Sequence, residues 1–281
     1  MRRARASFTV LLLATVIAFP VHATQSNVKI PNFSPDSNTG WLKPPGDEFI
    51  QPESGPGPVR ADPAHPYISN AIASQETSKI ADLTNPILQP WVVEKMRKEN
   101  EAVLAGKIGF TARSRCWPHG VPGFLLYPVH PIIFIQTPRE VLMTWGQDFQ
   151  LRHVYLDVPH SEHPKPSWYG ESVGHYENGD TLVVDTIGLN DRTYIDNYRT
   201  PHTMQLHVVE RFRLVSNTAM EVRVRVEDPG AFTMPWNAVQ RYRIDHRPGE
   251  VPLHEMVCAE NNEDHFNQGL VPIPQSDKAD F

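Results

Sequence analysis

Ten short segments between residues 124 and 258 constrain the fold of this chain more than any other feature of its sequence. Each segment has five to twelve residues, is rich in β-branched and aromatic side chains, and ends at turn residues. Segments of this kind predict strands, and the short joins between them predict antiparallel pairing. The predicted strands are 124–129, 132–137, 140–145, 151–157, 172–176, 181–187, 204–215, 220–227, 239–245 and 254–258.

A chain of antiparallel strands can close its sheet into a barrel or fold it into a sandwich. The stretch Glu177-Asn178-Gly179-Asp180 lies between two predicted strands and is typical of a hairpin turn. We therefore expect a mainly β fold, either an antiparallel β-barrel of the calycin kind or a β-sandwich. The succession of short hairpins favours the barrel.

Before the strands, the sequence predicts one helix and an extended arm. Residues 86–107 alternate apolar with charged side chains, and Pro90 and Gly106 suit the two ends of a helix at about 88–105. Residues 31–66 contain nine of the 27 prolines and almost no periodicity, which indicates an extended arm. The arm either wraps the body through anchors such as Trp41, Phe49 and Ile50 or is disordered. We assign residues 24–85 to the arm and 86–281 to one mainly β domain.

The first 23 residues have the pattern of a secretory signal peptide. Arg2, Arg3 and Arg5 precede an apolar run over residues 8–19, and small residues precede a cleavage point after Ala23. The run is shorter than the roughly 20 residues that span a bilayer, and no later stretch approaches that length. We therefore expect a periplasmic or secreted protein with no transmembrane segment in the mature chain.

Charge and cysteine content follow from export. Without the three leading arginines the chain keeps 23 basic and 32 acidic residues, a net charge of −9, which argues against nucleic acid as a partner. An oxidising compartment favours a disulfide between Cys116 and Cys258, the two cysteines of the chain. A nucleophilic Cys116 assisted by His119 is the less favoured alternative, since a histidine three residues away on a loop is not a positioned base.

One carboxylate breaks the alternation of the predicted strands. In segment 204–215 the face that carries Leu206, Val208 and Phe212 also carries Glu210. The apolar face of a strand turns toward the core, so Glu210 is expected to point inward. There it either pairs with an arginine or another donor as a structural group, or has a raised pKa and acts as a general acid or base.

The histidines are clustered in sequence but lack a metal-binding spacing. Six lie within 55 residues, which suggests a metal site or a proton-transfer site: His153, His160, His163, His175, His202 and His207. Their spacings match neither the helical histidine pair of zinc peptidases nor the paired-cysteine zinc sites. No cofactor is identified. A metal remains an alternative through His163 and His202 with Asp185 or Asp191.

Polar and aromatic residues near the predicted strand 181–187 could form the rim of a ligand site. Asp185 lies on this strand, a polar loop follows over residues 188–193, and a nearby loop contains Trp168 and Tyr169, which could stack on a flat organic ligand. Trp168 could equally fill the end of a barrel core. The chain has no GxSxG, Walker, GxGxxG or CxxCH motif. This argues against a serine hydrolase of the usual fold, a nucleotide enzyme, a dinucleotide oxidoreductase and a c-type cytochrome.

Long motifs resemble a family of exported bacterial proteins described as hypothetical secreted proteins. They are KPSWYGESVGHYENGDTLVVDT from Lys165, TPHTMQLHVVERF from Thr200, RCWP at 115–118 and VCAENN at 257–262. The resemblance implies export and a shared fold but no reaction. The family-like residues are His163, Gly174, Asp180, Asp185, Thr193, His202, Glu210 and Arg211.

These observations favour an exported barrel protein that binds a small organic molecule in its cavity and acts on it by lyase-, isomerase- or hydrolase-type acid–base chemistry. Glu210 and His202 would be the acid–base pair, with Asp185 orienting the histidine. The expected ligand-binding residues are Trp168, His163, Arg211 and Thr193. The alternatives are a non-catalytic scaffold in the cell envelope and a metal-assisted hydrolase. The sequence favours no particular oligomeric state.

Overall fold

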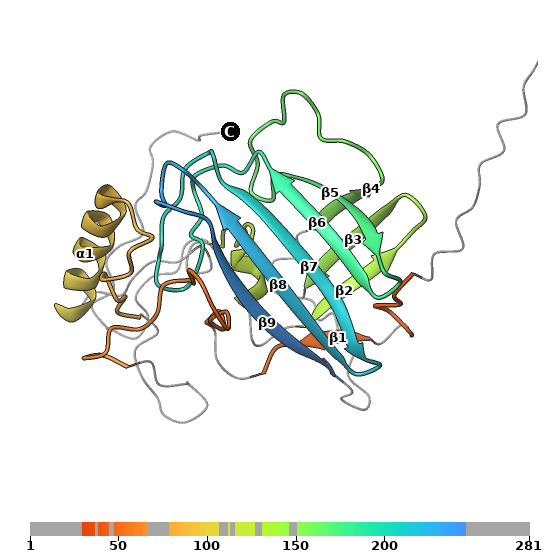
Figure 1. Cartoon of the computed structure of the whole chain (residues 1–281), viewed down its shortest axis with the longest axis horizontal. Helices are drawn as coiled ribbons and strands as arrows, with labels where there is room; N and C mark the ends of the chain where they lie inside the picture. Colours follow the sequence, from red (N-terminus) through yellow and green to blue (C-terminus); the bar gives the residue numbers. More distant parts are fainter. Residues whose placement is uncertain are drawn as a thin grey trace, which may run out of the picture.

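The computed structural model describes residues 30–36, 39–44, 48–66, 79–106, 112, 116–126, 131–145 and 151–245. Nine strands form a closed barrel in which each strand pairs with the next along the chain and β9 pairs with β1 (Figure 1). They are β1 (Gly40–Leu42), β2 (Ile132–Gln136), β3 (Glu140–Trp145), β4 (Leu151–Leu156), β5 (Glu171–Glu177), β6 (Thr181–Ile187), β7 (His207–Ser216), β8 (Ala219–Glu227) and β9 (Trp236–Asp245). The predicted mainly β barrel is confirmed. Because the sheet closes on itself, the sandwich is excluded.

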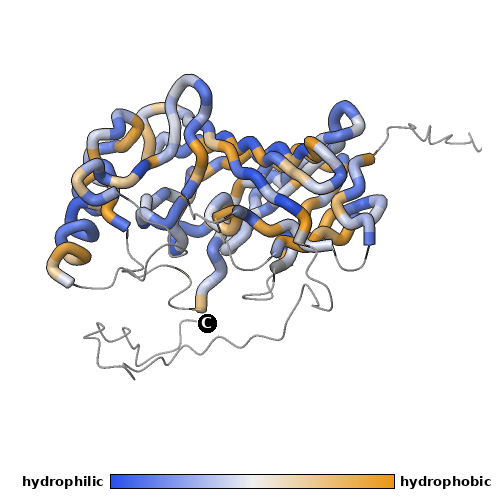
Figure 2. The backbone as a smooth tube through the Cα atoms, turned by 90° about the horizontal axis from the view of Figure 1, so that it is seen from below, coloured by the Kyte–Doolittle hydropathy of each residue, from blue (hydrophilic) through white to orange (hydrophobic). Residues whose placement is uncertain are grey.

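Alternating side chains give the barrel wall an apolar inner face and a polar outer face. In β8, Val222, Val224 and Val226 are buried, whereas Arg223 and Arg225 are exposed. Figure 2 shows the same alternation of hydrophobic and hydrophilic residues along the strands. The period of two therefore decides which side chains meet in the core.

One pair of neighbouring strands departs from the antiparallel expectation. β4 and β5 run parallel, with Val154 opposite Ser172 and Leu156 opposite Gly174. Parallel neighbours cannot be joined by a tight turn, so residues 157–170 carry the chain back along the barrel before β5 begins. This segment, the crossover loop, is the green loop above β4 and β5 in Figure 1.

The proline-rich segment supplies a strand that the sequence did not predict. β1 lies between β9 and β2, with Trp41 opposite both Ile244 and Ile132. Trp41 is 1% exposed, and its Nε1 donates a hydrogen bond to the carbonyl oxygen of Phe33 at 2.7 Å. Residues 40–42 of the arm are therefore part of the barrel wall.

Of the other two predicted anchors, one is buried. Phe49 packs edge-on against Trp236 with 6.3 Å between ring centroids, whereas Ile50 is 40% exposed although its backbone pairs with Val239. The proline-rich segment thus contributes both a strand and core side chains. We expect its removal to open the barrel.

The predicted helix is confirmed as α1 (Pro90–Leu104). Pro90 occupies the first turn, where its missing N–H costs no hydrogen bond, and Gly106 follows the helix with a φ of +83°. Val92, Met96 and Val103 are buried on one face of the helix. No helix in the described part of the chain is long and apolar enough to cross a membrane.

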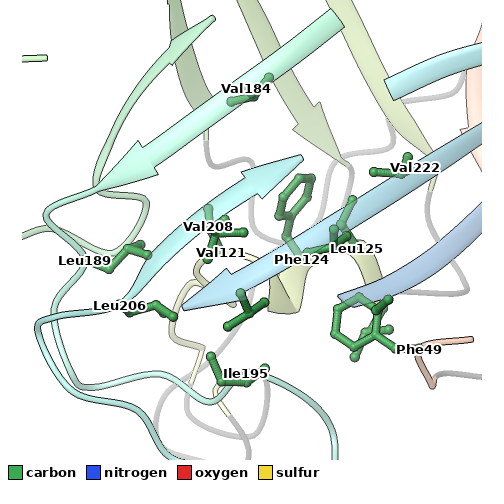
Figure 3. Packing of buried hydrophobic residues seen from close by; sticks show 14 of the residues in the cluster. Phe49, Val121, Phe124, Leu125, Val184, Leu189, Ile195, Leu206, Val208 and Val222 are labelled. Carbon is green, nitrogen blue, oxygen red and sulfur yellow. The ribbon is translucent and has the colours of Figure 1, made fainter. Parts of the chain in front are cut away.

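The first predicted strand is wrong over its described residues. Gly123–Leu126 form the 3-10 turn η2, and all four residues are buried. Figure 3 shows Phe124 and Leu125 among side chains of the barrel strands, including Val208 and Val222. A short apolar run does not distinguish a buried strand from a buried turn, because both can enclose every side chain.

Some predictions lie outside the described residues. These are the signal peptide at 1–23, the last predicted strand at 254–258 and Cys258, the second cysteine of the predicted disulfide. They stay predictions.

Trp41→Ala tests whether β1 is part of the core. Because Trp41 is almost fully enclosed, the change should lower the free energy of unfolding by about 3–5 kcal/mol, measured by urea denaturation. Ile50→Ala, in the same segment but 40% exposed, should cost less than about 1 kcal/mol. Equal losses in the two variants would contradict the proposed contribution of β1 to the core.

Candidate functional site

The barrel core contains a buried ion pair. Arg152 of β4 and Glu210 of β7 are both 0% exposed, and Arg152 Nη2 donates a short hydrogen bond to Glu210 Oε2. Arg152 also donates from Nη2 to Thr186 Oγ1 at 2.8 Å and from Nε to Ser172 Oγ at 3.2 Å. Of the two roles that the sequence left for Glu210, the structure shows pairing with an arginine.

This pair is enclosed by apolar side chains. The ring centroid of Phe124 lies 4.8 Å from Arg152 Cζ. Burial raises the pKa of Glu210, while the positive charge of Arg152 opposes that rise. Among the described residues, Arg152 Nη1 and Glu210 Oε1 have no hydrogen-bond partner. The pair therefore favours one strand register, because a shifted register would leave a charge buried alone.

Sequence reasoning missed Arg152, although a signal was present. Arg152 shares one face of the predicted strand 151–157 with Val154 and Leu156, just as Glu210 shares a face with apolar residues in its own strand. Two opposite charges on inward faces predict a buried pair. Applying the alternation test to basic as well as acidic residues would have found it.

His202 lies away from Glu210 in the segment between β6 and β7. It is 4% exposed, with Nδ1 3.0 Å from the carbonyl oxygen of Thr203 and Nε2 2.9 Å from Thr193 Oγ1. The carbonyl can only accept, so Nδ1 carries the proton and Nε2 accepts from the hydroxyl. Burial lowers the pKa of His202. His202 and Thr193 therefore form a neutral buried contact.

Asp185 of β6 is the centre of a different cluster, on the outer face of the barrel. His207 Nε2 lies 2.8 Å and His160 Nε2 lies 3.0 Å from Asp185 Oδ1. The other ring nitrogen of His160, Nδ1, lies 3.1 Å from Glu171 Oε1. Glu171 also accepts hydrogen bonds from the backbone N and the Oγ of Ser161, both at 2.7 Å. These five residues form the outer-face relay.

The hydrogen bonds of the relay stabilise its charged forms. Burial alone would raise the pKa of Asp185, but hydrogen bonds from His207 and His160 outweigh it and hold that pKa below its ordinary value. The same bond to Asp185 raises the pKa of His207. Hydrogen bonds from Ser161 lower the pKa of Glu171. Since an ionised carboxylate only accepts, His160 bonds both carboxylates at once only as the protonated ring.

The three expected catalytic residues are not brought together. Glu210 is inside the barrel with Arg152, Asp185 is outside with His160 and His207, and His202 bonds Thr193 and the Thr203 carbonyl. Alternation explains the separation of Glu210 from Asp185, since Glu210 pairs with Val184 and the neighbouring Asp185 points the opposite way. The structure therefore does not support one acid–base site made of the three.

Two of the expected ligand residues do share a site. Trp168 and His163 of the crossover loop line a groove of about 630 Å³ that also includes Tyr155, Lys165 and Glu171. Tyr155 is 47% exposed on the outer face of β4, so the groove lies outside the barrel. The crossover loop forms one of its walls.

The remaining expected ligand residues lie elsewhere. Arg211 is on the outer face of β7, with its Nε 3.7 Å from Glu177 Oε2. Thr193 is buried against His202. Neither lines the groove.

Backbone contacts hold the far end of the crossover loop against the segment after β6. Ser167 N donates to the carbonyl oxygen of Gly188 at 3.0 Å, and Asn190 N donates to the carbonyl oxygen of Ser167 at 2.9 Å. Gly188 has a φ of +68°, and a Cβ there would lie 2.9 Å from Pro164 Cβ. Trp168 packs against Trp117 with 5.3 Å between ring centroids. The groove wall is therefore fixed at both ends, by the relay and by these contacts.

Comparison with family models, with curated proteins and with solved structures found no match. The resemblance to exported bacterial proteins stays a prediction.

Metal binding finds no direct support in the geometry. Among the described residues, no group of three or more histidine, cysteine, aspartate or glutamate side chains is arranged to hold an ion. Of the alternative ligand set, His163 lines the groove, whereas His202 already bonds Thr193 and the Thr203 carbonyl.

Replacing Arg152 and Glu210 singly and together tests the core pair. Arg152→Met or Glu210→Met alone should each lower the free energy of unfolding by about 3–5 kcal/mol, because each leaves the other charge buried without its partner. Arg152→Met combined with Glu210→Met should cost less than either single change, since Ser172 and Thr186 still bond each other at 2.8 Å. Urea denaturation checks this, and additive losses would contradict it.

The pH dependence of His207 tests the relay. A ¹⁵N–¹H NMR titration should give His207 a pKa above its ordinary value of about 6.5, and Asp185→Asn should remove that rise. Asp180→Asn, which removes a carboxylate bound to Arg213 on the same sheet, should leave it unchanged. An unaltered pKa in Asp185→Asn would show that the contact is not made.

The shifted pKa values of His207 and Asp185 also make the stability of the fold depend on pH. A raised folded-state pKa of His207 stabilises the fold below the pKa of an unfolded histidine, and this contribution is lost as pH rises through the folded-state value. The lowered pKa of Asp185 gives a contribution that is lost as pH falls through its own folded-state value.

Proposed function

We propose that this chain is an exported barrel protein that binds a small organic molecule with a flat ring in the groove beside the crossover loop. The observation that carries the proposal is the pairing of ring surface with polar groups in one groove. Trp168 and Tyr155 supply the rings, and His163, Lys165 and Glu171 supply hydrogen-bonding and charged groups. Small-molecule sites commonly combine an apolar surface with a few convergent polar groups.

The groove replaces the barrel interior as our candidate ligand site. Phe124, Leu125 and Leu126 of η2 lie buried within the barrel, and Tyr242 binds the Leu125 carbonyl oxygen through its hydroxyl at 2.6 Å. Exposed rings such as Tyr155, in contrast, are available for a ligand without any unfolding.

Acid–base chemistry on the bound ligand is the second candidate function. It is favoured by Glu171, which lines the groove and is hydrogen bonded to His160. Glu171 would take the proton from the ligand, and His160, which bonds Glu171 through Nδ1, would transfer its Nε2 proton to the Asp185 carboxylate. A ligand that binds and is recovered unchanged after prolonged incubation would leave only the binding function.

Trp168→Ala tests the proposed groove. We expect wild-type protein to bind 2-naphthamide, a neutral flat ring, by isothermal titration calorimetry, and Trp168→Ala to bind it at least about tenfold more weakly through loss of ring contact. The matched control is Trp91→Ala, since Trp91 is a half-exposed tryptophan on α1 that is not part of the groove. Equal affinities in the two variants would overturn the assignment.

A further inference from the structure

Resting on the proposed function, we infer that the natural ligand of the groove is a planar organic anion, such as an aromatic carboxylate. Its ring would lie against Trp168 and Tyr155, and its charge would face Lys165 and His163. The inference rests on a comparison of the groove side chains that already have hydrogen-bond or ion-pair partners with those that have none.

Two carboxylates in and beside the groove, Glu171 and Glu140, already have partners. Glu171 accepts hydrogen bonds from Ser161 and His160 on both of its oxygens. Glu140, on the neighbouring strand, faces the groove residue His153, with Glu140 Oε2 3.2 Å from His153 Nδ1. These two carboxylates therefore already have hydrogen-bonding partners before any ligand arrives.

Two other groove side chains, Lys165 and His163, have no such partner among the described residues. Lys165 and His163 both line the groove and are exposed, and no described residue forms an ion pair with either of them. A lysine ammonium has three donors and no acceptor, and an imidazole always offers at least one N–H. The uncommitted groups at this wall are therefore donors, which suit an anionic acceptor.

The backbone holds Lys165 in place. Its two neighbours, Pro164 and Pro166, each fix their own φ, and Pro164 packs directly on Gly188. Two residues further on, Ser167 is hydrogen bonded to the segment after β6. The backbone therefore loses less conformational freedom when a ligand binds, and this smaller entropic cost favours affinity.

The ring surface of the groove comes from Tyr155 of β4 and Trp168 of the crossover loop. Tyr155 is stacked with His153, with 6.1 Å between ring centroids and 23° between ring planes, and Trp168 is supported by Trp117. These ring contacts limit how Tyr155 and Trp168 can turn. A planar ligand with an acidic group at one edge matches this arrangement.

The charge of the groove differs from that of the whole chain, because its lining carries one lysine and one glutamate. The chain carries a formal charge of −6, so general electrostatic attraction cannot draw an anion to the protein. Selectivity for an anion would therefore depend on Lys165 and His163 themselves. Single substitutions of these residues can therefore test the inference.

Three probes with one ring system separate charge from shape: 2-naphthoate, 2-naphthamide and 2-naphthylmethylammonium. Wild-type protein should bind the carboxylate about fivefold more tightly than the amide, and the ammonium most weakly, measured by isothermal titration calorimetry at low ionic strength. Lys165→Gln should reduce the affinity for the carboxylate to that for the amide, and Lys165→Arg should retain the preference. Lys98→Gln on α1, which removes the charge of another exposed lysine outside the groove, should change nothing.

The outcomes distinguish this inference from the proposed function. Equal binding of the three probes, weakened equally by Trp168→Ala, would overturn the anionic ligand while leaving the groove as a ring-binding site. A carboxylate preference that survives in Lys165→Gln would also overturn it. Failure of every probe to bind wild-type protein would overturn the proposed function itself.

Discussion

The parallel pairing of β4 and β5 is the constraint on which the outer surface of this protein depends. Two neighbouring strands that run the same way force the chain to return along the barrel before the second strand can begin. The returning residues, 157–170, bring His160 to Asp185 and place Trp168 beside the outer face of β4. An antiparallel connection at this point would leave neither the groove wall nor the relay.

The core depends on a different interaction. Arg152 and Glu210 come from strands separated by β5 and β6, and the hydroxyls of Ser172 and Thr186 on those two strands complete a polar row across four strands. Because each member needs its neighbour, this row specifies the strand register more sharply than interchangeable valines do. The inner face thus sets the register, and the outer face gains its side-chain arrangement from the same register.

Sequence patterns predicted local structure well because period and turn chemistry are local properties. Eight of the ten predicted strands, α1 and the inward direction of Glu210 followed from alternation, and Pro90 and Gly106 marked the helix ends. The partners of Asp185 could not be predicted in the same way, since one of them lies on the crossover loop, whose position depends on which strands become neighbours. β1 was missed because three residues among prolines show no period, and its role appears only when the sheet closes.

The position of β1 also sets an order of events. β1 pairs with β2 only between Trp41 and Ile132, whereas all three of its residues pair with β9, so most of its pairing forms only when the last strand has been made. As the ribosome adds residues from the N-terminus, some two hundred residues follow Trp41 before that strand is complete. Closing such a long loop carries a large entropic cost that no local contact repays in advance. A chain of this design completes its core after synthesis, and the nascent polypeptide must be kept from other chains until then.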